Sequence, residues 1–182
     1  PVFSLSGIMS WEDSMEPELS SIRKTSQYRR PGERPFTAEE REKVTILIGG
    51  LTQKHEEFIR AVFQGSGYRC EMLPLPDQEA FLLGKEFGNN GLCNPTYFTV
   101  GNLIAYLQSL EHEGMSRREI IDSYVFFTAG ACGPCRFGMY ESEYRLALRN
   151  AGFEGFRELI LQQHGGLDRQ AGVHPVGFAG GV

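Results

Sequence analysis

The fold is decided by residues 43–50, which read Lys43-Val44-Thr45-Ile46-Leu47-Ile48-Gly49-Gly50. β-Branched and aliphatic residues follow one another here without alternating with polar ones, which is typical of a parallel strand buried on both faces. The two glycines predict a turn at its end. Because such a strand needs cover on both sides, this stretch predicts a parallel sheet with helices on each face.

A helix and a second strand are expected directly after this strand. Apolar residues recur at one-turn spacing over residues 53–64, which predicts an amphipathic helix ended by Gly65-Ser66-Gly67. Residues 68–73 predict the second strand, and Pro74 stops it because proline has no N–H to donate to a ladder. Strand, helix and strand in this order predict a parallel βαβ unit.

The remaining chain continues the alternation of helices and strands. Asp77 is expected to cap a helix that runs to about Phe87, a longer helix starts after Pro95, and another ends near Asn150. Ser116 to Glu119 predicts a further capped turn. Strands are expected at residues 123–128 and 156–161. The predicted fold class is therefore α/β, a three-layer parallel sheet flanked by helices.

The two ends of the chain differ in composition from the middle. Residues 1–41 are rich in Ser, Glu, Arg and Pro and predict an extended arm or linker, in which Thr37 to Glu40 has the spacing of a short capped turn. Residues 42–165 form the expected cysteine-containing domain, and residues 166–182 a Gly-rich tail. Since the chain opens on Pro1 without a leader pattern, we expect a piece of a longer protein.

Composition excludes several classes of partner. The chain has 182 residues, 41% of them hydrophobic, and a net charge of −5 without a basic block, so we expect no nucleic-acid partner. No apolar run approaches the roughly 20 residues of a membrane helix. Four cysteines do not make a secreted disulfide framework in a chain of this size. We therefore expect a cytoplasmic protein that does not enter a membrane.

Three cysteines are the candidate ligands of a metal centre. Cys93 and the pair in Cys132-Gly133-Pro134-Cys135 stand in loops that precede predicted helices, where free N–H groups and the helix dipole favour thiolates and anionic sulfide. Arg136 and Asn90 are candidate cofactor-binding neighbours, which would donate hydrogen bonds to sulfur. Cys70 alternates with polar residues in the second strand and is expected to be buried there.

Two long stretches of the chain carry a resemblance to a known family. They include Gly88-Asn89-Asn90-Gly91-Leu92-Cys93-Asn94-Pro95-Thr96-Tyr97 and Thr128-Ala129-Gly130-Ala131-Cys132-Gly133-Pro134-Cys135-Arg136. Both resemble the acyl-CoA dehydratase activase-related proteins, which are related to the 2-hydroxyglutaryl-CoA dehydratase components and their ATP-dependent activators. The likeness extends over roughly residues 25 to 166. It places Cys93, Cys132 and Cys135 at the matching cysteine positions.

This resemblance implies a Rossmann-like domain that holds an iron–sulfur cluster, 4Fe-4S or larger. The implied function is low-potential electron transfer in anaerobic metabolism, linked to 2-hydroxyacyl-CoA dehydration or a related reduction, as part of an enzyme of that type. Expected partners are the rest of the parent chain or an ATP-dependent activator, an acyl-CoA thioester, and a second copy in a homodimer. The sequence has no Gly-x-x-x-x-Gly-Lys-Ser/Thr loop, so ATP is expected only through another domain or partner.

Two other functions stay open on the sequence alone. A Cys-x-x-Cys pair also serves thioredoxin-like dithiol oxidoreductases, although Ala131 stands where that family has an aromatic residue. The same cysteines could belong to a structural zinc or interaction module, for which a fourth ligand is missing. No catalytic residue is assigned by the sequence.

Overall fold

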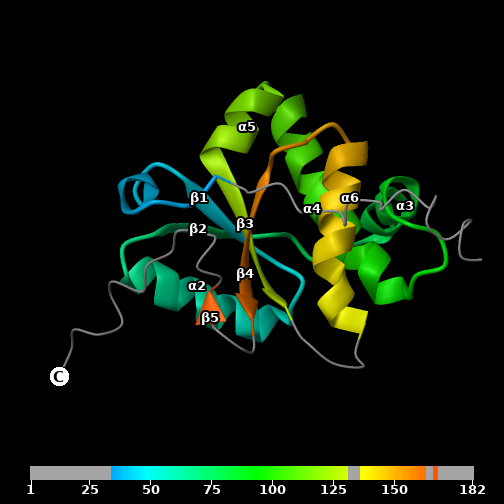
Figure 1. Cartoon of the computed structure of the whole chain (residues 1–182), viewed down its shortest axis with the longest axis horizontal. Coiled ribbons are helices and arrows are strands. Elements are labelled where there is room, and N and C mark those ends of the chain that lie inside the picture. Colours follow the sequence, from blue (N-terminus) through cyan, green and yellow to red (C-terminus); the bar gives the residue numbers. More distant parts are fainter. Residues whose placement is uncertain (1–33, 131–135, 163–165, 168–182) are drawn as a thin grey trace, which may run out of the picture. The chain divides into compact units, whose positions relative to one another are not determined.

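The computed structural model describes residues 34–130, 136–162 and 166–167. Within this part the strands form one sheet in the order β2-β1-β3-β4-β5 (Figure 1). The strand bounds are β1 Thr45–Ile48, β2 Arg69–Met72, β3 Tyr124–Gly130, β4 Arg157–Gln162 and β5 Gly166–Leu167. The first four strands pair in parallel, and β5 pairs antiparallel with β4.

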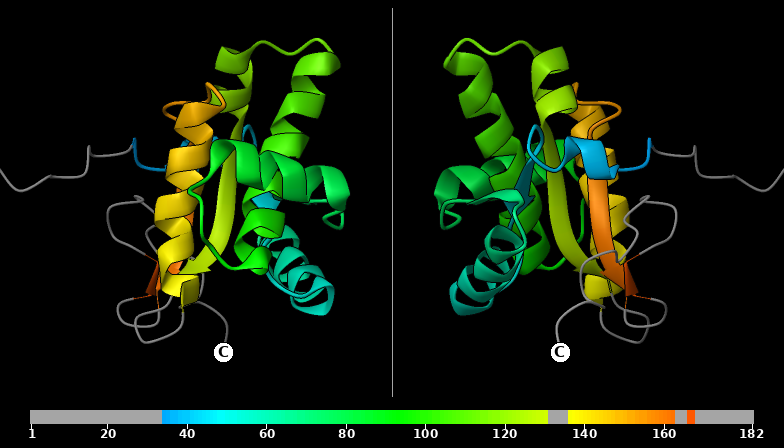
Figure 2. Two further views of the ribbon diagram at one scale, coloured as in Figure 1. Left: turned by 90° about the vertical axis from the view of Figure 1, so that its right-hand side faces the viewer. Right: turned by 90° about the vertical axis from the view of Figure 1, so that its left-hand side faces the viewer.

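Helices cover both faces of this sheet. The α-helices are α2 Gln53–Gly65, α3 Gln78–Phe87, α4 Asn94–His112, α5 Arg117–Ser123 and α6 Tyr140–Asn150, and two short 3-10 helices are η1 Ala38–Glu40 and η2 Arg136–Met139. One core gathers Ile46 and Ile48 of β1 with Ile59 and Phe63 of α2. The other gathers Leu47 of β1 with α4 and α6 (Figures 1 and 2). The structure thus confirms the predicted α/β sheet flanked by helices.

The connections run in two directions from β1. The α2 crossover leads to β2 on one side of β1, whereas β3 pairs on the other side of β1 after the chain has passed through α3, α4 and α5. The order of strands therefore reverses between β1 and β3. In doubly wound sheets ligands bind outside the carboxyl ends of the strands at such a reversal. A functional site is therefore expected at the carboxyl edge beside β1 and β3.

Local sequence signals locate the helix ends well. The Asp77 carboxylate accepts a hydrogen bond from Ala80 N at 3.0 Å and caps α3 as predicted. Ser116 and Glu119 form a capping box, which opens the seven-residue helix α5. Thr37 N donates to the Glu40 carboxylate at 3.0 Å at the start of η1.

Two features at the ends of the domain leave no signal in the sequence. Phe36 is 3% exposed in the core beside β1, so the packed part of the protein includes residues ahead of the expected boundary at 42. Strand β5 lies in the segment expected to be a tail, and it is only two residues long. A strand of this length leaves no periodicity to detect.

Helices α3 and α4 pack with their backbones almost touching. A Cβ atom built on Gly101 would come 1.7 Å from the carbonyl oxygen of Ala80, and one built on Gly84 would come 2.0 Å from that of Tyr97. Only glycine leaves room for such a crossing. This contact fixes the position of α4, and with it the loop that carries Cys93.

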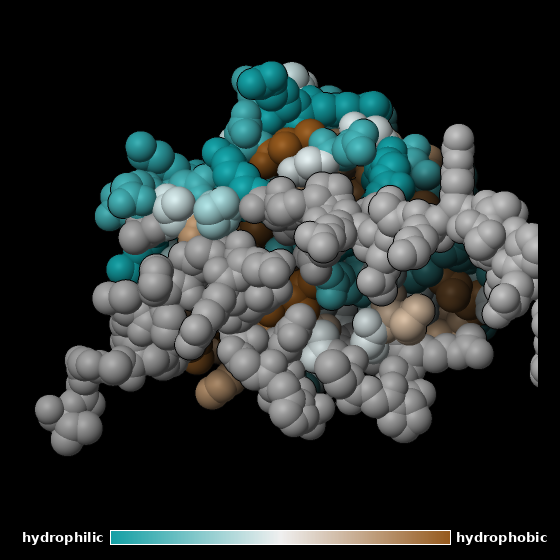
Figure 3. Space-filling model, in the orientation of Figure 1, coloured by the Kyte–Doolittle hydropathy of each residue, from teal (hydrophilic) through white to brown (hydrophobic). Residues whose placement is uncertain are grey.

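The opposite, amino end of the sheet is polar. The surface over α5 and the neighbouring turn is mainly hydrophilic (Figure 3). There Arg117 pairs with Glu111 at 2.5 Å and Arg118 pairs with Asp122 at 3.9 Å.

Among the described residues, no helix is both long and apolar enough to cross a bilayer.

The α3–α4 contact predicts a clear stability effect. Gly101→Ala should lower the free energy of unfolding by about 3 kcal/mol, because the added methyl group meets backbone and not a flexible side chain. Gly65→Ala is the matched control, since a Cβ there meets no atom within 4 Å and alanine favours the helix. Urea unfolding of both variants measures the difference. Equal midpoints for the two would contradict the close helix crossing.

Candidate functional site

The first turn at the carboxyl edge follows β1. Gly50 has a φ of +82°, and a Cβ there would come 2.7 Å from the Tyr144 hydroxyl. Leu51 N donates to the buried carboxylate of Glu56 at 2.9 Å, and burial raises the pKa of that carboxyl group. A carboxylate of the chain itself thus closes this turn. The turn is a strand-to-helix connection, as expected, and not a phosphate cradle.

Cys93 is the N-cap residue of α4 and lies beside the start of α6. Its Sγ atom is 3.0 Å from the Thr96 hydroxyl and 3.6 Å from the Tyr140 hydroxyl. Leu92 N donates to the Tyr97 hydroxyl at 3.0 Å, which holds the preceding residue in place. The N-terminus of α4 therefore places positive partial charge near this sulfur, and the first residue of α6 reaches it through the Tyr140 hydroxyl.

These surroundings stabilise the thiolate of Cys93. Hydrogen bonds from Thr96 and then Tyr140 lower the pKa of this thiol, and they outweigh the small opposing effect of burial. Cys70 shows the reverse, because burial raises the pKa of its thiol to about 12. Of these two cysteines, only Cys93 has the properties of a metal ligand or reactive thiol.

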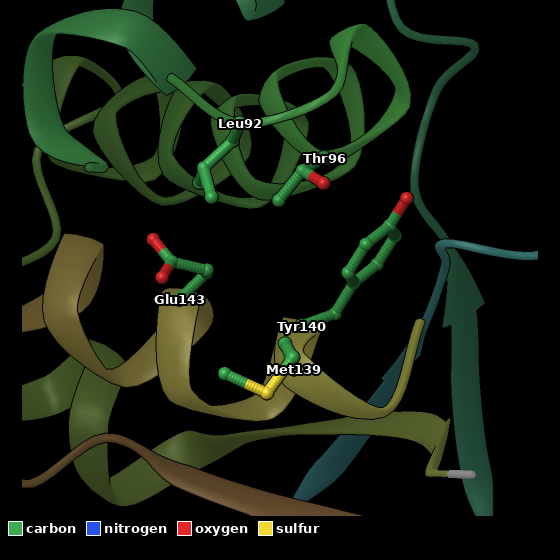
Figure 4. Close-up of a pocket in the computed structure, with 5 residues that line it drawn as sticks. All are labelled: Leu92, Thr96, Met139, Tyr140 and Glu143. Carbon is green, nitrogen blue, oxygen red and sulfur yellow. The ribbon is translucent and has the colours of Figure 1, made fainter. Parts of the chain in front are cut away.

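A pocket lies next to Cys93, between the start of α4 and the start of α6. It has a volume of about 160 Å³ and is lined by Leu92, Thr96, Met139, Tyr140 and Glu143 (Figure 4). Thr96 and Tyr140 are the two residues whose hydroxyls contact the Cys93 sulfur. A molecule in this pocket would therefore touch the side chains that hold the thiol.

Glu143 is the charged group on the pocket wall. It is 6% exposed, and its carboxylate accepts hydrogen bonds from the Asn89 side-chain amide at 2.9 Å and from Asn89 N at 3.3 Å. Both donors come from the loop between α3 and α4. Glu143 thus ties that loop, which leads to Cys93, to the first turn of α6.

The structure describes only some of the candidate site residues. Cys132 and Cys135 lie outside the described residues, and so does the side chain of Arg136, whose backbone opens η2. Asn90 is exposed in the loop before α4, and its neighbour Asn89 makes the contacts to Glu143. Cys70 is buried in β2, as expected.

Sequence reasoning missed three parts of the site, which are the Tyr140 hydroxyl, the Thr96 hydroxyl and the Glu143 carboxylate. Tyr140 is buried on the inward face of α6, and its hydroxyl reaches the sulfur. Glu143 stands three residues after Tyr140, which places it on the same inward face. A charged residue on the buried face of a helix was the available signal for this site.

Known proteins add no assignment to this geometry. Comparison of the chain with protein-family models, with curated proteins and with solved structures gave no match. Within the described ranges no group of three or more His, Cys, Asp or Glu side chains is arranged to hold a metal ion. Any centre that uses Cys93 would need ligands from outside the described residues.

The contrast between the two described cysteines can be measured directly. In metal-free, reduced protein at pH 7, iodoacetamide should alkylate Cys93 at least tenfold faster than Cys70, because the thiolate fraction falls as the pKa rises and Cys70 is also buried. Peptide mass spectrometry separates the four cysteines. Equal rates for Cys93 and Cys70 would contradict the site geometry.

The Thr96 hydroxyl is expected to be responsible for part of this reactivity. Thr96→Val should slow alkylation of Cys93 at pH 7 about three- to tenfold, because a hydrogen bond to a charged sulfur is lost. Thr99→Val is the matched control on the same helix, since the Thr99 hydroxyl donates to the Thr96 carbonyl oxygen. The same slowing in both variants would mean that the sulfur contact has no effect.

Proposed function

We propose that this chain is an iron–sulfur redox module in which Cys93, Cys132 and Cys135 hold the cluster. The observation that carries the proposal is the contact of Cys93 Sγ with Tyr140, the first residue of α6. Only the four residues of η2 separate Tyr140 from Cys135 along the chain. Because a 3-10 helix rises about 2 Å per residue, the backbone of Arg136 lies roughly 8 Å from that of Tyr140.

The other end of the cysteine loop leaves the same edge of the sheet. Gly130 ends β3 at its carboxyl end, and Cys132 follows two residues later. Residues on both sides of the Cys132 to Cys135 loop are therefore anchored at the edge where Cys93 stands. The positions of these flanking residues support a centre shared by the three cysteines.

The chemistry of the described residues fits an iron–sulfur centre. Cys93 favours the thiolate that iron needs, and it stands at the N-terminus of α4, whose positive end favours negative charge on sulfur. The Thr128 hydroxyl on β3, two residues before Gly130, is buried without a hydrogen-bond partner, so a donor is available there. When bound, such a cluster would supply one-electron transfer at a potential set by these surroundings.

The described side chains would adjust that potential in opposite directions. Hydrogen bonds to a ligand sulfur stabilise the reduced, more negative cluster and raise its potential. The buried carboxylate of Glu143 opposes added negative charge and lowers the potential. A low-potential role is consistent with a carboxylate that is 6% exposed and therefore poorly screened by solvent.

The biological context of the module rests on the family resemblance of the two cysteine-containing stretches. On that basis we propose low-potential electron transfer linked to 2-hydroxyacyl-CoA dehydration or a related reduction. The partner would be an ATP-dependent activator or another part of a longer chain. The substrate would be an acyl-CoA thioester, and a homodimer is the expected assembly.

Purification without oxygen tests this proposal. The protein should be brown, with visible absorption that bleaches in air, and should contain iron and acid-labile sulfide. Cys93→Ser should lose most of its iron, whereas Cys70→Ala should keep it because the Cys70 thiol is buried in β2. A colourless protein that reduces insulin disulfides would support a dithiol enzyme instead. Stoichiometric zinc would support a structural module.

A further inference from the structure

The pocket beside Cys93 is large enough to bind more than water. Its volume of about 160 Å³ is well above the roughly 10–15 Å³ that one water molecule needs. Leu92 and Met139 provide apolar wall, and Thr96 and Tyr140 contribute hydroxyl-bearing side chains (Figure 4). Met139 is 61% exposed and stands at the rim. A ligand with a short apolar body fits such a wall.

Glu143 gives this pocket a negative charge that no cation among the described residues neutralises. Both hydrogen bonds to its carboxylate come from neutral N–H groups of Asn89, and no ion pair reaches it from the described residues. Arg145, two residues further along α6, pairs with Glu141 at 3.4 Å and with Glu158 at 3.9 Å. Buried charges in proteins are normally paired, because burial without a counter-charge is costly.

Because no described cation pairs with this carboxylate and Leu92 and Met139 give the pocket an apolar wall, we propose that the pocket binds a small aliphatic ammonium group. The ammonium would sit against Glu143 and supply the missing positive charge. Its alkyl chain would lie along Leu92 and Met139, beside the residues that contact the Cys93 sulfur. This inference goes beyond the redox function and does not depend on a cluster.

Two features of the protein oppose a cation in this pocket, and neither cancels the negative charge of the Glu143 carboxylate. Glu143 lies in the first turn of α6, where the helix dipole provides about half a positive charge spread over several N–H groups. The Asn89 donors add further partial charge. A full counter-charge in direct contact with the remaining acceptor positions of the carboxylate is still favourable, since a carboxylate can accept about four hydrogen bonds.

Three four-carbon probes of equal length test the proposal on the full chain. Butylammonium chloride, 1-butanol and sodium butyrate are titrated at constant ionic strength and followed by saturation-transfer difference NMR. Butylammonium should bind saturably and at least tenfold more tightly than 1-butanol, and butyrate should not bind. Equal affinity for butylammonium and 1-butanol would show that the positive charge of the ligand does not contribute to binding, which would overturn the proposal. Equal competition by plain ammonium ion would assign the pocket to inorganic cations and also overturn the proposal.

Two single substitutions test whether Glu143 is the residue that binds the ammonium group. Glu143→Gln keeps the shape of the side chain and one acceptor oxygen, and it should weaken butylammonium binding at least tenfold. Glu141→Gln is the matched control, because it removes a charge from the same helix turn at a residue that does not line the pocket. Unchanged affinity in Glu143→Gln, or equal weakening in both variants, would show that Glu143 only fastens the Asn89 loop.

A second variant keeps the test decisive if Glu143→Gln does not fold. Met139→Trp narrows the mouth of the pocket at an exposed position, so the fold should be retained while butylammonium binding is lost. Binding that persists in Met139→Trp would place the ligand elsewhere. Iron analysis of the same preparations separates this result from the cluster proposal, since ammonium binding is expected with or without iron.

Discussion

The structure depends on a strand that has no polar face. Ile46 and Ile48 of β1 point into one core and Leu47 into the other, and all three are at most 1% exposed. Water must be excluded from both sides, so α2 covers one face while α4 and α6 cover the other. Chain connections then leave β1 in both directions, and the strand order reverses beside it. The carboxyl edge at this reversal is where β3 ends at Gly130 and where Cys93 caps α4.

The position of Cys93 depends on a backbone contact far from any reactive atom. Gly84 and Gly101 let α3 and α4 approach so closely that α4 has little freedom to slide or rotate. Its first turn is further held by Glu143 through the Asn89 loop and by Leu92 N on the Tyr97 hydroxyl. A thiol supported in this way is held in place before any metal binds, which reduces the entropy lost on binding.

The sequence predicted the features that are encoded locally. The uninterrupted apolar run of β1, the Asp77 cap and the Ser116–Glu119 box each depend on neighbouring residues, and each appears where expected. The site depends on distant residues. The Tyr140 hydroxyl reaches Cys93 across 47 positions and Glu143 meets Asn89 across 54, so both contacts follow from how α4 packs on α6. The helical repeat of apolar residues is consistent with Tyr140 on the inward face of α6, but it does not show which atom the Tyr140 hydroxyl contacts.

The charges around Cys93 link the two proposals through electrostatics. The N-terminus of α4 and the Thr96 and Tyr140 hydroxyls favour negative charge on sulfur, whereas Glu143 opposes it from the pocket between α4 and α6. A cation bound to Glu143 would remove that opposition and make an added electron more favourable. Because such coupling is reciprocal, reduction of a nearby cluster would in turn tighten cation binding. If both proposals hold, the pocket would make the electron affinity of the cluster respond to a bound ammonium group without any movement of the backbone.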